Sequence, residues 1–257
     1  MPNAEQFAEL VEAGDVEPVA EVLAEQPGLA HQFVPLLREW GEEQWLPLHR
    51  AAYHGHVEFV AMLLDVGAKV DSRTRYLAGP FHARCTALHF AASGGYGELV
   101  KLLLERGATL EVLDAHQATP LLRAARYGRA EAVHALLMAG ADPERREESD
   151  RNALHLAILG DRAEASGGNP EAAAALLIDH GCDLNVTCPR EPDAYTPLHR
   201  CVSRGPQRWP TAARLLDHRA DASLAHPQTG RTPLMLAEHL VVEGRAELKP
   251  FVELLKV

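Results

Sequence analysis

Aromatic residues and lysine are scarce in this sequence of 257 residues. Phe, Trp and Tyr make up 5% of the chain, and only four of its 25 basic residues are lysine. Hydrophobic residues still account for 47% and charged residues for 24%, so the chain has enough apolar side chains to form a core. A core with few aromatic rings relies on Ala, Leu and Val, which favours an all-α fold.

Long apolar runs are also missing. No segment approaches the roughly 18 apolar residues that a membrane-spanning helix needs. The N-terminal stretch MPNAEQFAELVEAGDVEP has neither the basic region nor the apolar region of a secretory signal. We therefore expect a cytoplasmic protein that does not associate with membranes.

Cysteine is rare as well. The four cysteines, at positions 85, 182, 188 and 201, form no closely spaced pairs, so a disulfide framework is not expected. Of the four, Cys188 falls in a predicted loop and is the one expected to be reactive.

The motifs of common catalytic centres are absent. The sequence contains no G-x-S-x-G turn, phosphate-binding loop, dinucleotide-binding glycine pattern or H-E-x-x-H helix. A net charge of −11 argues against nucleic acid as a partner, because neutralisation of phosphates drives that binding. We predict no catalytic residue, no metal ion and no cofactor.

What the sequence does contain is a repeat. One opening recurs six times: LPLHRAA at Leu46, TALHFAA at Thr86, TPLLRAA at Thr119, NALHLAI at Asn152, TPLHRCV at Thr196 and TPLMLAE at Thr232. Successive openings are 40, 33, 33, 44 and 36 residues apart, so the period is 33 with three insertions.

Each opening has the features of a helix start. Thr or Asn can accept hydrogen bonds from free backbone amides, and Pro is tolerated at the first helical position. A second helix follows with apolar residues at i, i+3 and i+4, such as Val100, Leu103 and Leu104. Most second helices end at Gly-Ala, where glycine favours the left-handed conformation that closes a helix.

These units resemble ankyrin repeats, whose pattern is TPLHxAAxxGHxxxVxxLLxxGA. The resemblance implies an all-α solenoid of antiparallel helix pairs joined by β-turn finger loops. It predicts one domain over residues 1–257, with a degenerate N-terminal cap at 1–40 followed by six repeats. The repeats are expected at 41–74, 75–114, 115–147, 148–190, 191–227 and 228–257.

The resemblance also implies that the TPLH histidines hydrogen-bond within and between repeats. This applies to His49, His89, His155 and His199. An alternative function is a metal-binding or small-ligand-binding enzyme, because His82 and Cys85 have a spacing that could hold zinc, with His54 as a further ligand.

In ankyrin repeats, the finger residues and the solvent-facing positions of the first helix line the surface that holds partners. Arginine and aromatic residues are concentrated at these positions, and these types often contribute interface energy. The predicted partner-binding residues are Trp45, Arg50, Tyr53, His54, Tyr76, Phe81, His82, Phe90, Arg123, Arg126, Tyr127, Tyr195, Arg200, Arg204 and Arg231. We expect a monomer that binds an acidic surface on another protein and inhibits or scaffolds it. Nucleic-acid binding by the same arginines is the competing interpretation, which the net charge disfavours.

The insertions lengthen loops. The first, near residues 73–82, is expected to expose Tyr76 and Phe81 on a finger, and the third lengthens the finger that ends at Tyr195. The second, GDRAEASGGNP at residues 160–170, is polar and rich in glycine, so a flexible spacer is expected there.

Overall fold

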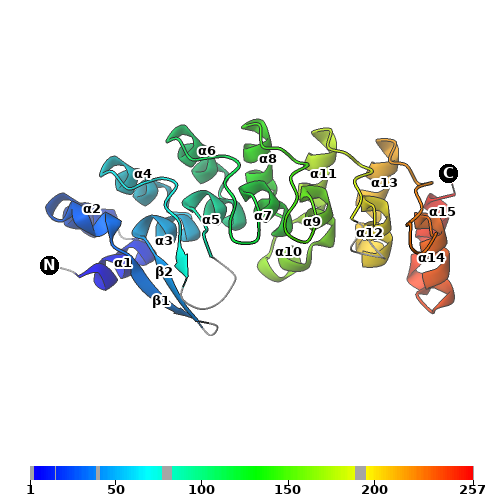
Figure 1. The fold of residues 1–257 in the computed structure, drawn as a ribbon, viewed down its shortest axis with the longest axis horizontal. Coiled ribbons are helices and arrows are strands. Elements are labelled where there is room, and N and C mark those ends of the chain that lie inside the picture. Colours follow the sequence, from blue (N-terminus) through cyan, green and yellow to red (C-terminus); the bar gives the residue numbers. More distant parts are fainter. Residues whose placement is uncertain (1–2, 15, 39–40, 77–82, 189–194, 257) are drawn as a thin grey trace. The chain divides into compact units, whose positions relative to one another are not determined.

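The computed structural model describes residues 3–14, 16–38, 41–76, 83–188 and 195–256 (Figure 1). The chain forms two compact units. The first comprises Met1–Ala124 with Glu131–Ala141, and the second comprises Ala125–Ala130 with Asp142–Val257.

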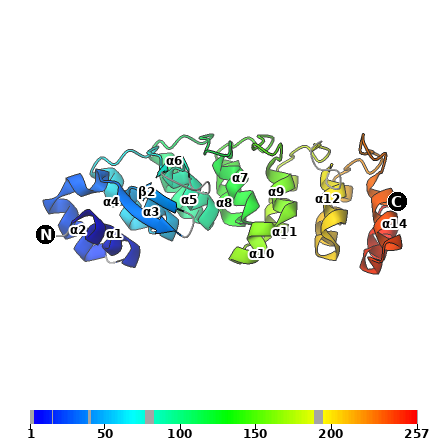
Figure 2. The same ribbon diagram turned by 60° about the horizontal axis from the view of Figure 1, so that its bottom comes forward.

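The first unit is built from antiparallel helix pairs. Its elements are α1 (Ala4–Ala13), α2 (Val16–Glu25), η1 (Pro27–His31), α3 (Pro47–His54), α4 (Val57–Asp65), α5 (Ala87–Gly94), α6 (Gly97–Glu105) and most of α7 (Pro120–Arg126) and α8 (Ala130–Met138). We call the first helix of each pair the inner helix and the second the outer helix. The inner helices α1, α3 and α5 pack side by side, and so do the outer helices α2, α4 and α6 (Figures 1 and 2).

The second unit repeats this plan. Its elements are α9 (Ala153–Leu159), α10 (Asp161–Ser166), α11 (Pro170–Asp179), α12 (Pro197–Arg204), η2 (Pro206–Arg208), α13 (Trp209–Asp217), α14 (Pro233–Val242), η3 (Ala246–Leu248) and α15 (Lys249–Leu254). The all-α architecture expected from the sequence is confirmed. Within the described ranges, no helix combines the length and the apolar character needed to cross a membrane.

The helix ends follow the chemistry of the repeat. The side chain of Asn152 accepts a hydrogen bond from the His155 amide at 3.1 Å, and Thr232 does the same for Met235 at 3.3 Å. The glycines that close α3 and α5, Gly55 and Gly95, have left-handed φ angles of 77° and 87°. A side chain at these positions would be strained, which explains why the turn between inner and outer helices uses glycine.

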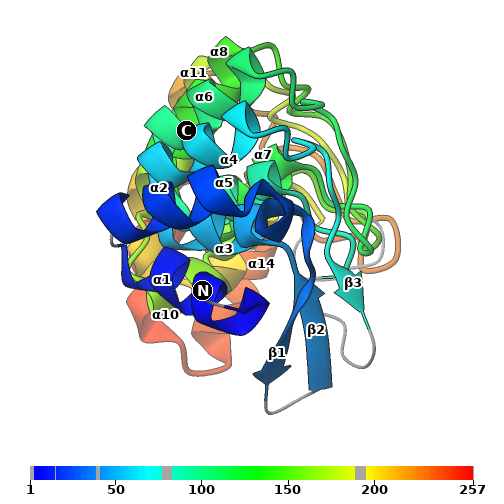
Figure 3. The ribbon, with the colours of Figure 1, turned by 90° about the vertical axis from the view of Figure 1, so that its left-hand side faces the viewer.

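A small β-sheet was not predicted. Strands β1 (Val34–Arg38), β2 (Gly41–Trp45) and β3 (Arg75–Tyr76) pair antiparallel in the order β1-β2-β3, with Val34 opposite Trp45 and Glu43 opposite Tyr76 (Figure 3). The hairpin crosses the expected boundary between cap and first repeat, so neither segment alone revealed it. Its last residue, Trp45, leads directly into α3.

The second insertion is not a flexible spacer, and that prediction was wrong. Residues Asp161–Ser166 form α10, and Ala163 is fully buried. The Asn169 amide donates to the Gly128 carbonyl at 2.8 Å, which ties the end of the insertion to the turn after α7. The alanines of DRAEAS favour a helix, and small residues allow it to pack closely.

Side-chain acceptors link successive fingers. In the first unit, Asp71 accepts from the Thr109 amide at 3.0 Å. In the second, Glu144 accepts from the Asp183 amide at 2.7 Å, and Asn185 accepts from the Asp221 amide at 2.7 Å. Each acceptor lies at the same place after its outer helix, so the fingers are held by a repeated polar contact.

Candidate functional site

Three of the TPLH histidines, His49, His89 and His199, have the structural role that the resemblance implied. The His89 Nδ1 atom accepts from the Thr86 amide at 3.2 Å, and its Nε2 lies 3.1 Å from the Ala118 carbonyl of the next finger. His199 makes the corresponding contact with the Arg231 carbonyl at 3.0 Å. Burial lowers the pKa of His89 to about 3, with a further lowering by Arg123, and burial lowers the pKa of His49 to about 4. These imidazoles are therefore neutral at pH 7 and join neighbouring repeats.

The alternative of a metal-dependent site gains no support. Among the described residues, no group of three or more His, Cys, Asp or Glu side chains is arranged to hold a metal ion. Cys85 is fully buried and His54 is exposed, while His82 lies outside the described residues.

The expectation that Cys188 is reactive was wrong. All four cysteines are free thiols and all four are buried. Cys188 itself is fully buried, and its Sγ lies 3.8 Å from the Ser149 carbonyl oxygen. Burial also raises the pKa of Cys182 and of Cys201 to about 12, which keeps both sulfurs as unreactive thiols.

The residues directly after the TPLH histidines, or after Leu122 that replaces one, do not face solvent, although four of them were predicted to bind a partner. Arg50, Phe90, Arg123 and Arg200 have only 5%, 1%, 7% and 2% of their surface exposed. They stand in the first turns of the inner helices, where a finger or the preceding pair covers them. In this structure they therefore present almost no surface to solvent.

Arg123 illustrates what these arginines do. Its guanidinium pairs with the Asp114 carboxylate, with Nη2–Oδ2 2.6 Å and Nε–Oδ2 2.7 Å. Asp114 also accepts from the Ala118 amide at 2.9 Å. Burial alone would raise the pKa of Asp114, but Arg123 and the backbone amide outweigh it and lower that pKa below its usual value. The ion pair thus fixes the finger that contains Asp114 to the inner helix α7 that follows it.

Other arginines pair with acidic residues in the same way. Arg50 pairs with Glu12 of α1, and Arg126 pairs with the buried Glu147, which Arg151 also approaches at 3.7 Å. Sequence reasoning missed Asp114 and Glu147. The signal was present, because each is an acid five residues before the helix-capping Thr119 or Asn152.

Trp45 is likewise a core residue rather than an exposed one, which corrects a further predicted binding residue. It is buried against Phe90, with ring centroids 4.4 Å apart, and Tyr53 meets it edge-on at 5.4 Å. Trp45 ends β2, so the unpredicted hairpin delivers its ring to this cluster. Of these three aromatic side chains, Tyr53 alone reaches solvent, with 39% of its surface exposed.

The last turns of the inner helices remain open. We call the seventh and eighth positions after each helix-capping residue the inner-helix row. All of its members except Gly160 are exposed or partly exposed: Tyr53, His54, Ser93, Gly94, Arg126, Tyr127, Leu159, Gly160, Ser203, Arg204, His239 and Leu240. The predicted residues Tyr53, His54, Arg126, Tyr127 and Arg204 belong to this row.

The remaining predicted residues lie on the fingers. Tyr195 is partly exposed and meets His226 edge-on at 5.0 Å, and Arg231 is partly exposed. Tyr76 forms part of β3, but its side chain, Phe81 and His82 lie outside what the structure describes. An unpredicted residue, Tyr96, lies across Gly55 and Gly94, at the ends of α3 and α5.

Comparison with known proteins agrees with this architecture. A family model for ankyrin repeats in three copies matches residues 74–147, and an ankyrin-repeat model matches residues 43–75 and 149–189. The chain belongs to the ankyrin-repeat family. Ankyrin repeat and SOCS box protein 16 of Mus musculus is 33% identical over 197 residues, which cover 77% of this chain and 41% of that protein. The ankyrin-repeat chain described above thus spans about two fifths of the length of this relative. Ankyrin repeats are generally protein–protein interaction modules.

Proposed function

We propose that this chain is a non-enzymatic binding module that inhibits or scaffolds another protein through its inner-helix row and its fingers. The observation that carries the proposal is the division within each inner helix. The first turns are used for packing and ion pairs, while the last turns present side chains to solvent. A repeat scaffold held this firmly loses little entropy when it binds.

The second unit is suited to an acidic partner surface. Arg126, Arg204 and Arg231 are each partly exposed, and Tyr127 and Tyr195 add aromatic area nearby in the repeat pattern. Arginine pairs with carboxylates through a planar, two-pronged guanidinium, and Tyr and Arg are frequent hot-spot residues. Arg126 contributes less than expected, because its guanidinium already pairs with Glu147.

Affinity capture from an extract of the source organism tests this proposal. The double variant Arg204→Glu/Arg231→Glu should lose a protein that the wild type retains. The matched control is Lys249→Glu/Lys256→Glu, which changes the net charge equally at two exposed positions of the last helix pair. Equal capture by both double variants, or equal loss from both, would contradict the assignment.

A further inference from the structure

The first unit carries an exposed aromatic surface that contains two predicted binding residues and one unpredicted residue. It consists of Tyr53 and His54, at the end of α3, together with Tyr96 from the turn between α5 and α6. We call these three residues the aromatic patch. Tyr53 and His54 are exposed and Tyr96 is partly exposed.

The Tyr53 ring of the aromatic patch is held in place by its neighbours without a ligand. Tyr53 meets Trp45 edge-on at 5.4 Å, Phe90 at 6.0 Å and His54 at 5.1 Å. Three aromatic neighbours restrict its rotamers although its surface is open. An immobilised ring loses little conformational entropy when a ligand covers it, so more of the contact energy appears as affinity.

Two glycines leave space for the Tyr96 ring. A methyl group added at Gly94 would overlap the Tyr96 ring, and one added at Gly55 would come within 2.6 Å of it. Tyr96 therefore lies over the C-terminal ends of α3 and α5, where Gly55 and Gly94 stand. The bare glycine backbone at these two positions leaves room for the Tyr96 ring.

Exposed acidic residues lie on α1, the inner helix that packs beside α3. Glu12 pairs with Arg50, one turn before Tyr53, so the face of α1 that carries Glu12 adjoins α3. Glu5 and Glu9 lie on that face by helical spacing and are exposed, and within the described residues no basic side chain pairs with either of them.

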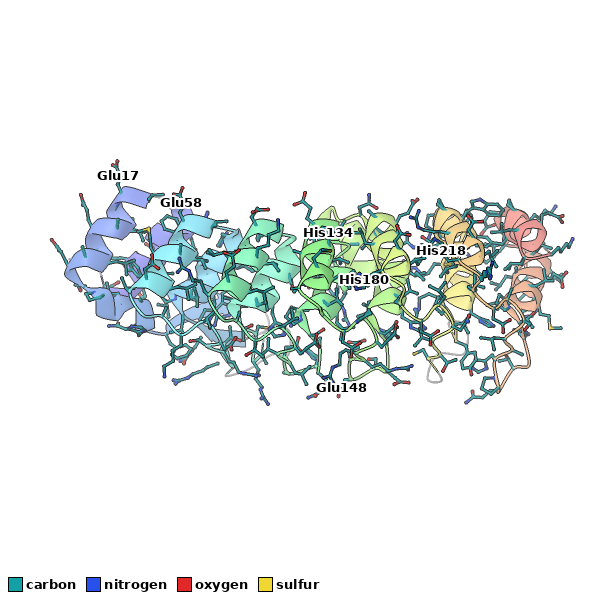
Figure 4. All side chains as sticks on the ribbon, turned by 90° about the horizontal axis from the view of Figure 1, so that it is seen from above. Glu17, Glu58, His134, Glu148, His180 and His218 are labelled. Atoms are coloured by element: carbon teal, nitrogen blue, oxygen red, sulfur yellow. The ribbon has the colours of Figure 1, made fainter. Side chains whose placement is uncertain are left out.

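The N-terminal part of the chain as a whole is also negatively charged. The first 65 residues contain twelve acidic and two basic residues, a net charge of −10 out of −11 for the whole chain. Glu17 and Glu58 extend outward from α2 and α4 in the same unit (Figure 4). Of the two basic residues in this stretch, Arg50 is buried in its ion pair. A cationic ligand would therefore be attracted to this part of the molecule.

We infer that the aromatic patch binds an arginine-bearing segment of a partner protein. A guanidinium can stack on a tyrosine or histidine ring while it is attracted by the net negative charge of this part of the chain. Arginine stacks better than lysine because its charge is planar and weakly hydrated. An acidic ligand, which we propose for the second unit, would meet like charge here. The inference rests on the proposed binding function but concerns a different unit and the opposite ligand charge.

Fluorescence anisotropy with defined peptides tests the inference on the full chain. The probe is a labelled twelve-residue peptide of alternating Gly and Arg, compared with peptides in which citrulline or Glu replaces every Arg. Citrulline keeps the planar shape and removes the charge. The protein variants are Tyr53→Leu, Tyr53→Phe and Glu5→Gln/Glu9→Gln, with Tyr127→Leu in the second unit as the matched control.

The Arg peptide should bind at low salt, and the citrulline and Glu peptides should bind at least tenfold more weakly. Tyr53→Leu should weaken binding of the Arg peptide about tenfold, since the ring is lost but the apolar packing is kept, whereas Tyr53→Phe and Tyr127→Leu should bind like the wild type. Glu5→Gln/Glu9→Gln should weaken binding severalfold and flatten its salt dependence.

Failure of the Arg peptide to bind, equal binding of the citrulline peptide, or unchanged binding by Tyr53→Leu would overturn the inference. None of these results bears on capture through Arg204 and Arg231. The proposed function would instead be contradicted if Arg204→Glu/Arg231→Glu captured the partner as well as the wild type does.

Discussion

Arg123 and Asp114 form a buried ion pair that joins a finger to the inner helix following it. Both side chains are almost completely covered, and the guanidinium reaches the carboxylate with two nitrogens, at 2.6 and 2.7 Å. The sequence pattern had placed Arg123 on a partner-binding surface. Its position in the core changes what a substitution there should do.

The variant Arg123→Glu should unfold at a markedly lower urea concentration than the wild type. It would place a second carboxylate beside Asp114 and leave both without a counter-ion, which we expect to cost about 3–5 kcal/mol. The double variant Asp114→Asn/Arg123→Gln, with two neutral groups that can hydrogen-bond, should recover part of this loss. Wild-type stability in Arg123→Glu would show that the pair is not formed.

Gly168 should tolerate no side chain. A methyl group there would overlap the Tyr127 carbonyl oxygen, which is backbone and cannot move aside. We expect Gly168→Ala to cost about 1–3 kcal/mol and to increase hydrogen exchange of the α10 amides. Gly28→Ala is the control, because a methyl group at Gly28 meets nothing within 4 Å. Equal stability of the two variants would mean that α10 does not pack on the turn after α7.

Stability should fall as the pH is lowered from 7 to 5. Burial lowers the folded-state pKa of His49 to about 4 and of His89 to about 3, so the unfolded chain, with pKa values near 6.5, binds more protons in this range. Each such histidine should cost about 2 kcal/mol at pH 5. The measurement is the free energy of unfolding in urea at several pH values.

The variant His49→Gln provides the internal check on this pH dependence. Removing one buried histidine should reduce the slope between pH 5 and 6 by about 1.2 kcal/mol per pH unit, whatever the variant does to stability at pH 7. An unchanged slope would indicate that His49 is protonated equally in the folded and unfolded states.

Thiol reagents should distinguish folded from unfolded protein completely. All four cysteines are buried, and burial raises the pKa of Cys182 and Cys201 to about 12. We expect no rapid reaction with a disulfide reagent in the native state and four reacting thiols in denaturant. Rapid native labelling at Cys188 would restore the original expectation of an exposed loop.

The repeat pattern was sufficient to predict the helix pairs and their ends. A capping residue such as Thr232, a glycine such as Gly55 and the apolar triplet of the outer helix are local signals, and each fixes backbone geometry without help from distant residues. The same signals supported the structural role of His89, because its hydrogen-bond partners are set by the repeat itself.

Burial of individual side chains could not be predicted in this way. Whether Arg123 faces solvent depends on Asp114 in the finger before it, and whether Trp45 is covered depends on Phe90 forty-five residues later. The repeat gives the direction in which a side chain leaves its helix but not the neighbours it meets. The insertion at α10 was misjudged for a related reason: its glycines suggested mobility, whereas Gly168 permits close packing.

Site-specific photocrosslinking tests the proposed binding surface most directly. A benzophenone amino acid would replace Tyr127, in the inner-helix row, in one variant and Met138 in a second variant. Met138 lies on outer helix α8 with 72% of its surface exposed. The Tyr127 position should crosslink to a specific partner protein in the source extract, while the Met138 position should not. Crosslinking to that partner from Met138 and not from Tyr127 would contradict a binding role for the inner-helix row.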